Sequence, residues 1–201
     1  MPSSAPSSSD GAELRRLLRT TVTGVTIVTT IDADRNPRGL TANSFTSVSL
    51  EPALVLVCIA RSAGSFPAFL EARHFAINIL CESQIELSRR FASRLPDKFC
   101  GVRYRGSVGG APIISGSLAW LDCRRYDGIE AGDHLILIGE VLAFGHREAR
   151  PLGYCRGEYI RLDDVKIPRA SEARDQACHA EVAPPGHTSS AHGPHNGGRH
   201  P

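Results

Sequence analysis

The tripeptide Gly132-Asp133-His134 is the first candidate for chemistry in this sequence, because it stands directly before the aliphatic run of residues 135–141. A histidine at the start of a strand offers a hydrogen-bond donor and an acceptor near neutral pH. The carboxylate of Asp133 can fix the tautomer of that imidazole. The same three residues also suit an ordinary surface turn. The tripeptide alone therefore leaves both interpretations open.

A second candidate is the polar segment of residues 41–49, which lies between apolar runs. Its hydroxyl and amide side chains are Thr41, Asn43, Ser44, Ser47 and Ser49. Such groups, together with backbone N–H groups, can bind a phosphate without a large positive charge. Because alternate residues of a strand share a face, we expect Thr41 and Asn43 to point together. An exposed Ser/Thr-rich edge is the plain alternative.

Composition and motifs exclude several classes of function. The chain has 201 residues and a formal net charge of +2, with acids and bases interspersed, which disfavours a nucleic-acid groove. It contains no Gly-x-Ser-x-Gly elbow, no phosphate loop and no Gly-x-Gly-x-x-Gly fingerprint. Its six cysteines are spread singly, so no metal site is expected from them. With no signal-like or membrane-spanning stretch, we expect a cytoplasmic protein with reduced thiols.

The chain divides into three parts by composition. Residues 1–12 are rich in Ser, Pro and Ala and predict a disordered arm, whereas residues 13–166 form the expected folded domain. Residues 167–201 are rich in Pro, Gly, Ser and His and have few large apolar groups, which favours a disordered tail. The histidines of this tail could bind a metal, but a solvated segment is the better interpretation.

The elements that must position the candidates are mostly strands. Apolar and β-branched runs predict strands at residues 22–31, 39–44, 53–60, 74–80, 117–125, 135–144 and 157–162. Helical spacing predicts short helices at residues 13–19, 64–72 and 82–94, and a turn is expected over residues 127–133. Because no regular alternation of strand and helix is present, the pattern favours a mainly β, antiparallel barrel with short helices inserted.

An ordered set of segments resembles the flavin reductase family, which has an FMN-binding split barrel. The matching segments are residues 23–30, 39–45, 47–52, 75–80, 97–99, 132–134 and 157–159. They occur in the order of the family and span roughly residues 14–162. In pattern the chain is most similar to the small reductase components of two-component flavin-dependent monooxygenases, such as the 4-hydroxyphenylacetate hydroxylase type.

This resemblance implies a homodimer that binds FMN or FAD in a groove near the subunit interface. The residues that it assigns to the flavin are Thr41, Ala42, Asn43, Ser44, Ser47, Val48, Ser49, Cys58, Ile59, Ala60, Phe75, Asn78, Lys98 and Phe99. It assigns His134, with Asp133 and Tyr154, to NADH or NADPH. No residue is assigned as an acid or a base.

The implied activity is hydride transfer from NADH or NADPH to N5 of the flavin, which supplies reduced flavin to a partner oxygenase. A non-catalytic flavin or haem carrier on the same barrel is one alternative. An enzyme similar to pyridoxamine-phosphate oxidase is another, although Gly132-Asp133-His134 argues against it. The sequence leaves the choice between the flavins and between the nucleotides open.

Overall fold

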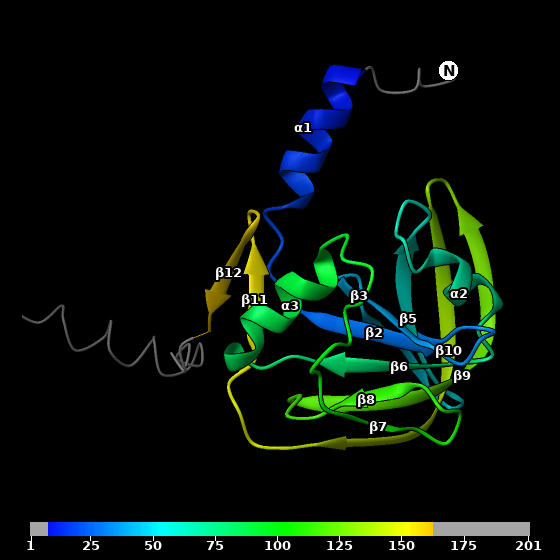
Figure 1. Ribbon diagram of the computed structural model, residues 1–201. Helices are drawn as coiled ribbons and strands as arrows, with labels where there is room; N and C mark the ends of the chain where they lie inside the picture. The colour runs from blue at the N-terminus through cyan, green and yellow to red at the C-terminus, as the bar shows by residue number, and fades with distance from the viewer. Residues whose placement is uncertain (1–7, 163–201) are drawn as a thin grey trace, which may run out of the picture. The chain divides into compact units, whose positions relative to one another are not determined.

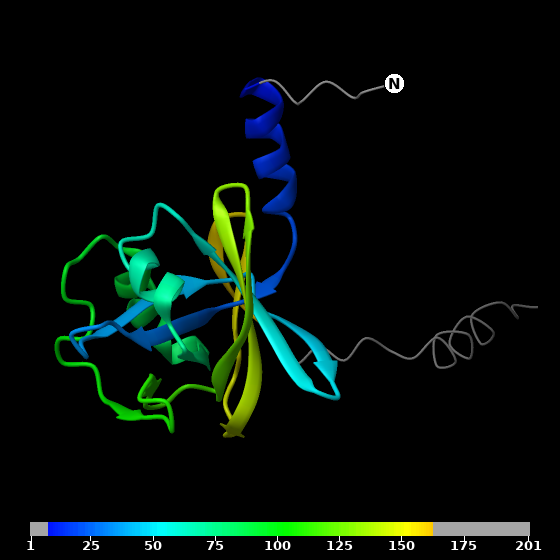
Figure 2. The same ribbon diagram turned by 90° about the vertical axis from the view of Figure 1, so that its right-hand side faces the viewer.

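A seven-stranded antiparallel sheet forms the centre of the computed structural model, which describes residues 8–162 (Figures 1 and 2). These residues fall within one compact unit, residues 1–162. The strand order is β3-β2-β6-β9-β10-β5-β4. In chain order the strands are β2 (Thr26–Ile31), β3 (Pro37–Ala42), β4 (Thr46–Leu50), β5 (Ala53–Ala60), β6 (His74–Ile79), β9 (Ala119–Ala131) and β10 (His134–His146).

The core lies inside the curled sheet and follows the alternation of its strands. Along β5, Val55, Val57 and Ile59 are buried, while the residues between them are half-buried. The facing side chains of Phe75, Leu137 and the other core residues pack against them. Burial at every second residue is the pattern of a strand with one covered face, and the other face of β5 and β10 therefore lies outside the core.

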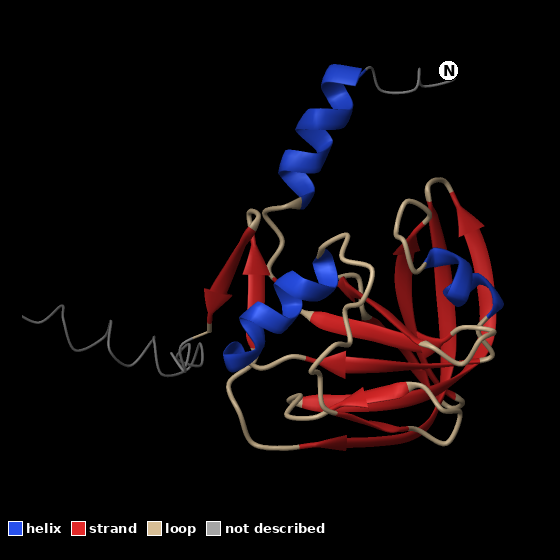
Figure 3. Cartoon of the chain, in the orientation of Figure 1, coloured by secondary structure: helices blue, strands red, loops and turns tan. Residues whose placement is uncertain are grey.

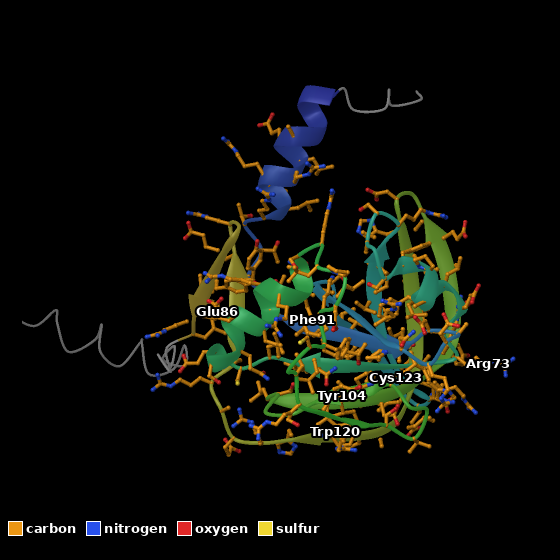
Figure 4. The ribbon with its side chains drawn as sticks, viewed as in Figure 1. Arg73, Glu86, Phe91, Tyr104, Trp120 and Cys123 are labelled. Atoms are coloured by element: carbon orange, nitrogen blue, oxygen red, sulfur yellow. The ribbon has the colours of Figure 1, made fainter. Side chains whose placement is uncertain are left out.

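Three helices and one short 3-10 turn accompany the sheet. They are α1 (Ser8–Leu18), α2 (Phe66–Glu71), η1 (Glu82–Gln84) and α3 (Ile85–Ala92). Phe91 is buried between α3 and the barrel, whereas Glu86 lies on the exposed side of the helix (Figure 4). Gly39 of β3 permits this approach, because a Cβ atom there would lie 2.9 Å from the Phe91 ring. None of the helices described is long and apolar enough to span a membrane.

Two smaller sheets complete the fold, and strands dominate the whole (Figure 3). One sheet contains β1 (Thr23–Gly24), β11 (Leu152–Cys155) and β12 (Glu158–Arg161), and the other is the hairpin of β7 (Tyr104–Gly106) and β8 (Pro112–Ile114). Asn78 holds β8 against the barrel, because its Oδ1 accepts from the Ile114 N–H at 2.7 Å and its Nδ2 donates to Ile27 O at 3.1 Å.

The architecture confirms the predicted mainly β, antiparallel barrel with short helices, but several local predictions were wrong. The expected turn over residues 127–133 is strand as far as Ala131, because residues 127–131 pair with β10 despite their polar composition. Strands β4, β7, β8 and β11 were not predicted. Residues 8–12 of the expected arm belong to α1; Ser and Asp are common at helix starts, which favours this earlier beginning. The predicted tail, residues 167–201, lies outside the described residues.

Candidate functional site

A two-residue turn between β9 and β10 positions His134. Gly132 has a φ of 57°, a conformation that glycine adopts at little cost, and it lets Ala131 and His134 pair directly. The Arg61 N–H donates to the Asp133 carbonyl at 2.9 Å and fastens the turn to the end of β5. His134 is thus the first residue of β10, and its pairing with Ala131 and Ala60 fixes its position in the sheet.

Asp133 orients the imidazole. The His134 Nδ1 and Asp133 Oδ1 atoms lie 2.7 Å apart, and this hydrogen bond, followed by the charge of the imidazole, lowers the pKa of Asp133. An ionised carboxylate only accepts hydrogen bonds, so Nδ1 is the nitrogen that carries a proton toward it. In the neutral ring, Nε2 is then left as an acceptor for a ligand.

The half-buried face of β5 and β10 continues from His134 along the sheet. We call it the outer face, and its residues are Leu54, Leu56, Cys58, Ala60, His134, Ile136 and Ile138. His134 pairs with Ala60, and Ile136 pairs with Cys58. Directly paired residues of antiparallel strands place their side chains on the same side. A small or aliphatic surface therefore lies next to the imidazole.

Ser44 connects the polar segment to this outer face. Its Oγ donates to Cys58 O at 3.1 Å and accepts from the Cys58 N–H at 3.0 Å. Cys58 is only two residues, or about 7 Å of strand, from Ala60, which pairs with His134. The structure thus brings Ser44, Cys58, Ala60 and His134 together from three separate parts of the sequence.

Most hydroxyls of residues 41–49 are engaged within the protein. Thr41 Oγ1 donates to Ser88 O at 2.7 Å, on the side of α3, and Ser49 Oγ donates to Pro52 O. The sequence predicted that Thr41 and Asn43 point together. In the structure the Thr41 hydroxyl is bonded to α3, so of the two only the exposed Asn43 side chain is available to a ligand. Ser47 and Val48 are exposed on β4, where a bulge interrupts the pairing with β5.

Four of the residues expected at the flavin have their side chains inside the barrel. Ile59 and Phe75 are fully buried in the main core, and Ala42 packs in the same cluster. Asn78 is also fully buried and is bonded to Ile27 and Ile114. These side chains support the strands of the site and present no surface to a ligand in a single chain.

Lys98 and Phe99 lie on the connection that follows α3. Lys98 Nζ donates to Phe91 O at 2.8 Å, which satisfies a carbonyl in the last turn of the helix, and partial burial lowers the pKa of this amine. Phe99 packs edge-on against Phe91, with ring centroids 4.9 Å apart. Both residues therefore fix α3 and the loop after it.

Tyr154 lies on β11, in a different sheet from His134. Its ring packs edge-on against Tyr159, with centroids 5.4 Å apart, and the Tyr159 hydroxyl lies 2.8 Å from Ser88 Oγ. Because Thr41 bonds to the Ser88 carbonyl, Tyr154 connects to the strip of residues 41–49 through α3 rather than to the imidazole.

Two surface hollows of the described residues lie away from these side chains. One of about 450 Å³ lies beside α2 and includes Asp32, Glu71 and His74, and another of about 450 Å³ lies on the exposed side of α3. Neither includes a residue expected at the flavin or the nucleotide. Within residues 8–162, no group of His, Cys, Asp and Glu has an arrangement that could hold a metal.

Sequence reasoning missed Ile136, which lies beside Cys58 on the outer face. The signal was present in the alternation of buried and half-buried residues from His134 onward. Residues 135–141 are nearly all aliphatic, so composition did not reveal which of them face outward.

Comparisons with known proteins assign the chain and its fold to a family. The model of the flavin reductase like domain matches residues 18–163. The chain belongs to this family. It is 47% identical over 151 residues to a probable flavin reductase from Rhizobium meliloti (strain 1021), covering 75% of this chain but only 49% of that relative.

Two further relatives are covered over most of their length. The reductase subunit of a flavin-dependent monooxygenase from Rhodococcus jostii (strain RHA1) is 41% identical over 158 residues, which are 78% of this chain and 80% of the subunit. The structure of an NADH:FAD oxidoreductase from Streptomyces globisporus C-1027, in complex with NAD and FAD fragments, has a TM-score of 0.74 and 35% identity. That match covers 82% of this chain and all of the other.

The residues at the outer face fit a flavin. A planar aromatic ring needs a flat apolar surface, and Cys58, Ala60 and Ile136 provide one with small or aliphatic side chains. The polar parts of the molecule need donors at the edge of that surface. Asn43 and Ser47 are exposed at the end of β3 and on β4, beside the strand that carries Cys58.

Proposed function

We propose that this chain is an NAD(P)H-dependent flavin reductase that supplies reduced FMN or FAD to a separate oxygenase. The observation that carries the proposal is the junction of Ser44, Cys58, Ala60 and His134 where the end of β5 meets the start of β10. Membership of the flavin reductase like family supports the reaction class. The reductase subunit from Rhodococcus, which belongs to a flavin-dependent monooxygenase, supports the role of reductase component.

The outer face and the polar segment of residues 41–49 both contact the bound flavin. When bound, the flavin supplies a ring that accepts a hydride from the reduced nicotinamide. Cys58, Ala60 and Ile136 exclude water from one side of that ring, and Asn43, Ser47 and nearby backbone groups hold its polar edge. Thr41 and Ser44 act indirectly, because their hydroxyls fix β3 to α3 and to β5.

His134 holds the nicotinamide against the flavin. Because Asp133 accepts a hydrogen bond from Nδ1–H, Nε2 is left to accept a hydrogen bond from the carboxamide N–H of the nucleotide. This contact sets the orientation of the nicotinamide, and the reaction requires the two rings to stack at roughly 3–3.5 Å. No proton needs to be transferred by the imidazole.

A second copy of the chain completes the groove. The outer face is half-buried in one chain, and its aliphatic side chains lie next to one another, Ile138 beside Leu56 and Ile136 beside Cys58. A contiguous apolar surface of this kind is characteristic of a covered interface. We infer a homodimer in which the partner covers the flavin. A cytoplasmic location stays a prediction, supported by the free cysteines of the described residues.

The test is oxidation of NADH and NADPH by the purified full chain with FMN, FAD and riboflavin added in turn. We expect flavin-dependent loss of the reduced nucleotide absorbance, with one nucleotide favoured. A protein that binds flavin tightly but leaves it oxidised after rapid mixing with either nucleotide is a carrier, and that result would overturn the proposal.

A further inference from the structure

The outer face extends beyond β10 onto the end of β9. Ile129 of β9 pairs with Ile136 of β10, and Ile136 pairs with Cys58 of β5. Because directly paired residues of antiparallel strands place their side chains on the same side, the three side chains form one line across the sheet. We call Cys58, Ile136 and Ile129 the cross-strand row. At the usual spacing of neighbouring strands, the row is roughly 10 Å long.

The two ends of the row differ in polarity. At the β5 end, Ser44 Oγ bonds to the N–H and the carbonyl of Cys58 at 3.0 and 3.1 Å, so the polar segment of residues 41–49 lies alongside this end. At the β9 end, Ile129 is the last side chain, because within the described residues the ladder between β6 and β9 stops at Arg124. The row therefore runs from hydroxyl and amide groups to a branched aliphatic side chain.

Ile129 is an apolar side chain without a place in the core. It is 47% exposed and belongs to none of the core clusters of the described residues. Its neighbours on the same face of β9 are Asp127, which pairs with Ile138, and Ala131, which pairs with His134. A single exposed aliphatic residue is ordinary. Ile129 differs because its side chain continues an apolar surface that begins in the proposed flavin site.

A flavin ring has the same change of polarity along its length as the row. Its pyrimidine end carries N–H and carbonyl groups, whereas its dimethylbenzene end has two methyl groups and no hydrogen-bonding atom. Three fused rings span about two strand spacings, roughly 10 Å. Polar groups that leave water need hydrogen-bond partners, so the pyrimidine end belongs beside residues 41–49. The methyl groups then lie at the β9 end.

We propose that Ile129 contacts the dimethylbenzene end of the flavin, and that the ring lies across β5, β10 and β9. This inference rests on the proposed function and adds a residue and a direction to its flavin site. His134 is two residues from Ile136 along β10, or about 7 Å, so its imidazole lies beside the middle of the row. This direction leaves the central ring, which accepts the hydride, nearest to the nicotinamide.

The test compares riboflavin with its analogue that lacks the two methyl groups. Fluorescence titration of the full chain measures the dissociation constant of each flavin. In Ile129→Ala we expect the constant for riboflavin to rise about fivefold or more, because the methyl groups lose most of an aliphatic contact. The constant for the analogue should rise by less than about twofold, because it has no methyl group to lose that contact. Ile129→Val keeps a branched side chain and should bind both flavins nearly as the parent does.

Two results would overturn the assignment of Ile129. An unchanged constant for riboflavin would show that the ring does not reach β9. An equal rise for both flavins would show that the substitution acts on folding or assembly, or that the ring is turned the other way. Val108→Ala removes part of an 86% exposed side chain between β7 and β8, and as the control it should change neither constant.

The same titrations keep this contact separate from the proposed function. A parent chain that binds both flavins, shows the expected dependence on Ile129 and oxidises neither nucleotide would refute the reductase activity and support the contact. A parent chain that reduces flavin, but whose riboflavin constant is indifferent to Ile129→Ala, would support the activity and refute the contact.

Discussion

The side-chain hydroxyls of Ser44 and Thr41 form hydrogen bonds that hold strands and helices of the protein together. Ser44 Oγ donates a hydrogen bond to Cys58 O and accepts one from the Cys58 N–H, and Thr41 Oγ1 donates to Ser88 O. A hydroxyl has a single proton to donate, so neither group can also donate to a ligand. The polar site predicted from these residue types stays a prediction, and the groups left to contact a ligand there are Asn43, Ser47 and the backbone.

The role of His134 predicts a change confined to one substrate. In His134→Ala, the acceptor for the nicotinamide carboxamide is lost, so the KM for the reduced nucleotide should rise roughly three- to tenfold. Flavin affinity should change little, because the proposed flavin surface is formed by Cys58, Ala60 and Ile136 and not by the imidazole. Steady-state kinetics with both substrates varied provide the measurement. A nucleotide KM equal to that of the parent would argue that His134 is only a turn residue.

Cys123 predicts a dependence of stability on alkaline pH. Burial, with a smaller contribution from the Asp122 charge, raises the pKa of its thiol from 9.0 to about 12. The folded state therefore holds this proton more tightly than the unfolded state. The associated stability is fully present below about pH 9 and is lost as the pH rises toward 12, by at most about 4 kcal/mol.

Urea denaturation of Cys123→Ala and of the parent from pH 8 to the highest pH at which both fold provides the check. The difference in unfolding free energy between the two proteins should shrink as the pH rises. Lysines and tyrosines titrate in both proteins, so their contribution cancels in this difference. A constant difference across the range would show that the thiol does not titrate between the two states.

At the scale of elements, Asn78 joins the β7–β8 hairpin to the barrel. It is fully buried and satisfies the Ile114 N–H and the Ile27 carbonyl. Replacing it by Ala leaves buried groups without partners, and we expect a loss of about 3 kcal/mol in the free energy of unfolding. Asn43→Ala is the matched control, since Asn43 is exposed and should cost less than 0.5 kcal/mol.

The same pair of variants separates structure from ligand binding. Flavin titrations should show weaker binding for Asn43→Ala and nearly unchanged binding for folded Asn78→Ala. If Asn78→Ala instead retains its stability and loses flavin affinity, the side chain reaches the ligand and the assignment of Asn78 to the interior is wrong.

Strong periodic elements were predictable from sequence, and elements made by pairing were not. The β-branched run of β2 and the apolar run of β5 identified two central strands. Strands β4 and β7 are short and largely exposed, so tertiary pairing rather than composition makes them strands. The site followed the same division. The order of motifs singled out His134 and Ser44 as candidates, but composition could not separate Ala60, on the outer face, from Ile59, in the core.

At the scale of the whole molecule, one face of the sheet lacks a cover. Helix α2 and the main core occupy the inner side of β5 and β10, whereas none of the outer-face residues belongs to the main core cluster, and all of them stay partly accessible to solvent. Beyond Glu140, β10 has no partner from β5, and Phe144 on that stretch is 73% exposed. A flavin bound on this surface would keep one side of its ring exposed to water unless a second chain covered it.

The proposed homodimer therefore predicts that assembly and flavin binding weaken together. In Leu56→Glu a charge replaces an apolar side chain of the outer face, beside Ile138, that is half-buried in the single chain. We expect the dissociation constant of the dimer to rise about tenfold or more, because the burial of one Leu side chain contributes roughly 2 kcal/mol. Light scattering after size exclusion measures the mass, and fluorescence titration measures flavin affinity. Val108→Glu is the control, since Val108 is 86% exposed on the β7–β8 hairpin, away from this face. A parent chain that is monomeric at every concentration and still binds flavin would show that the outer face needs no partner.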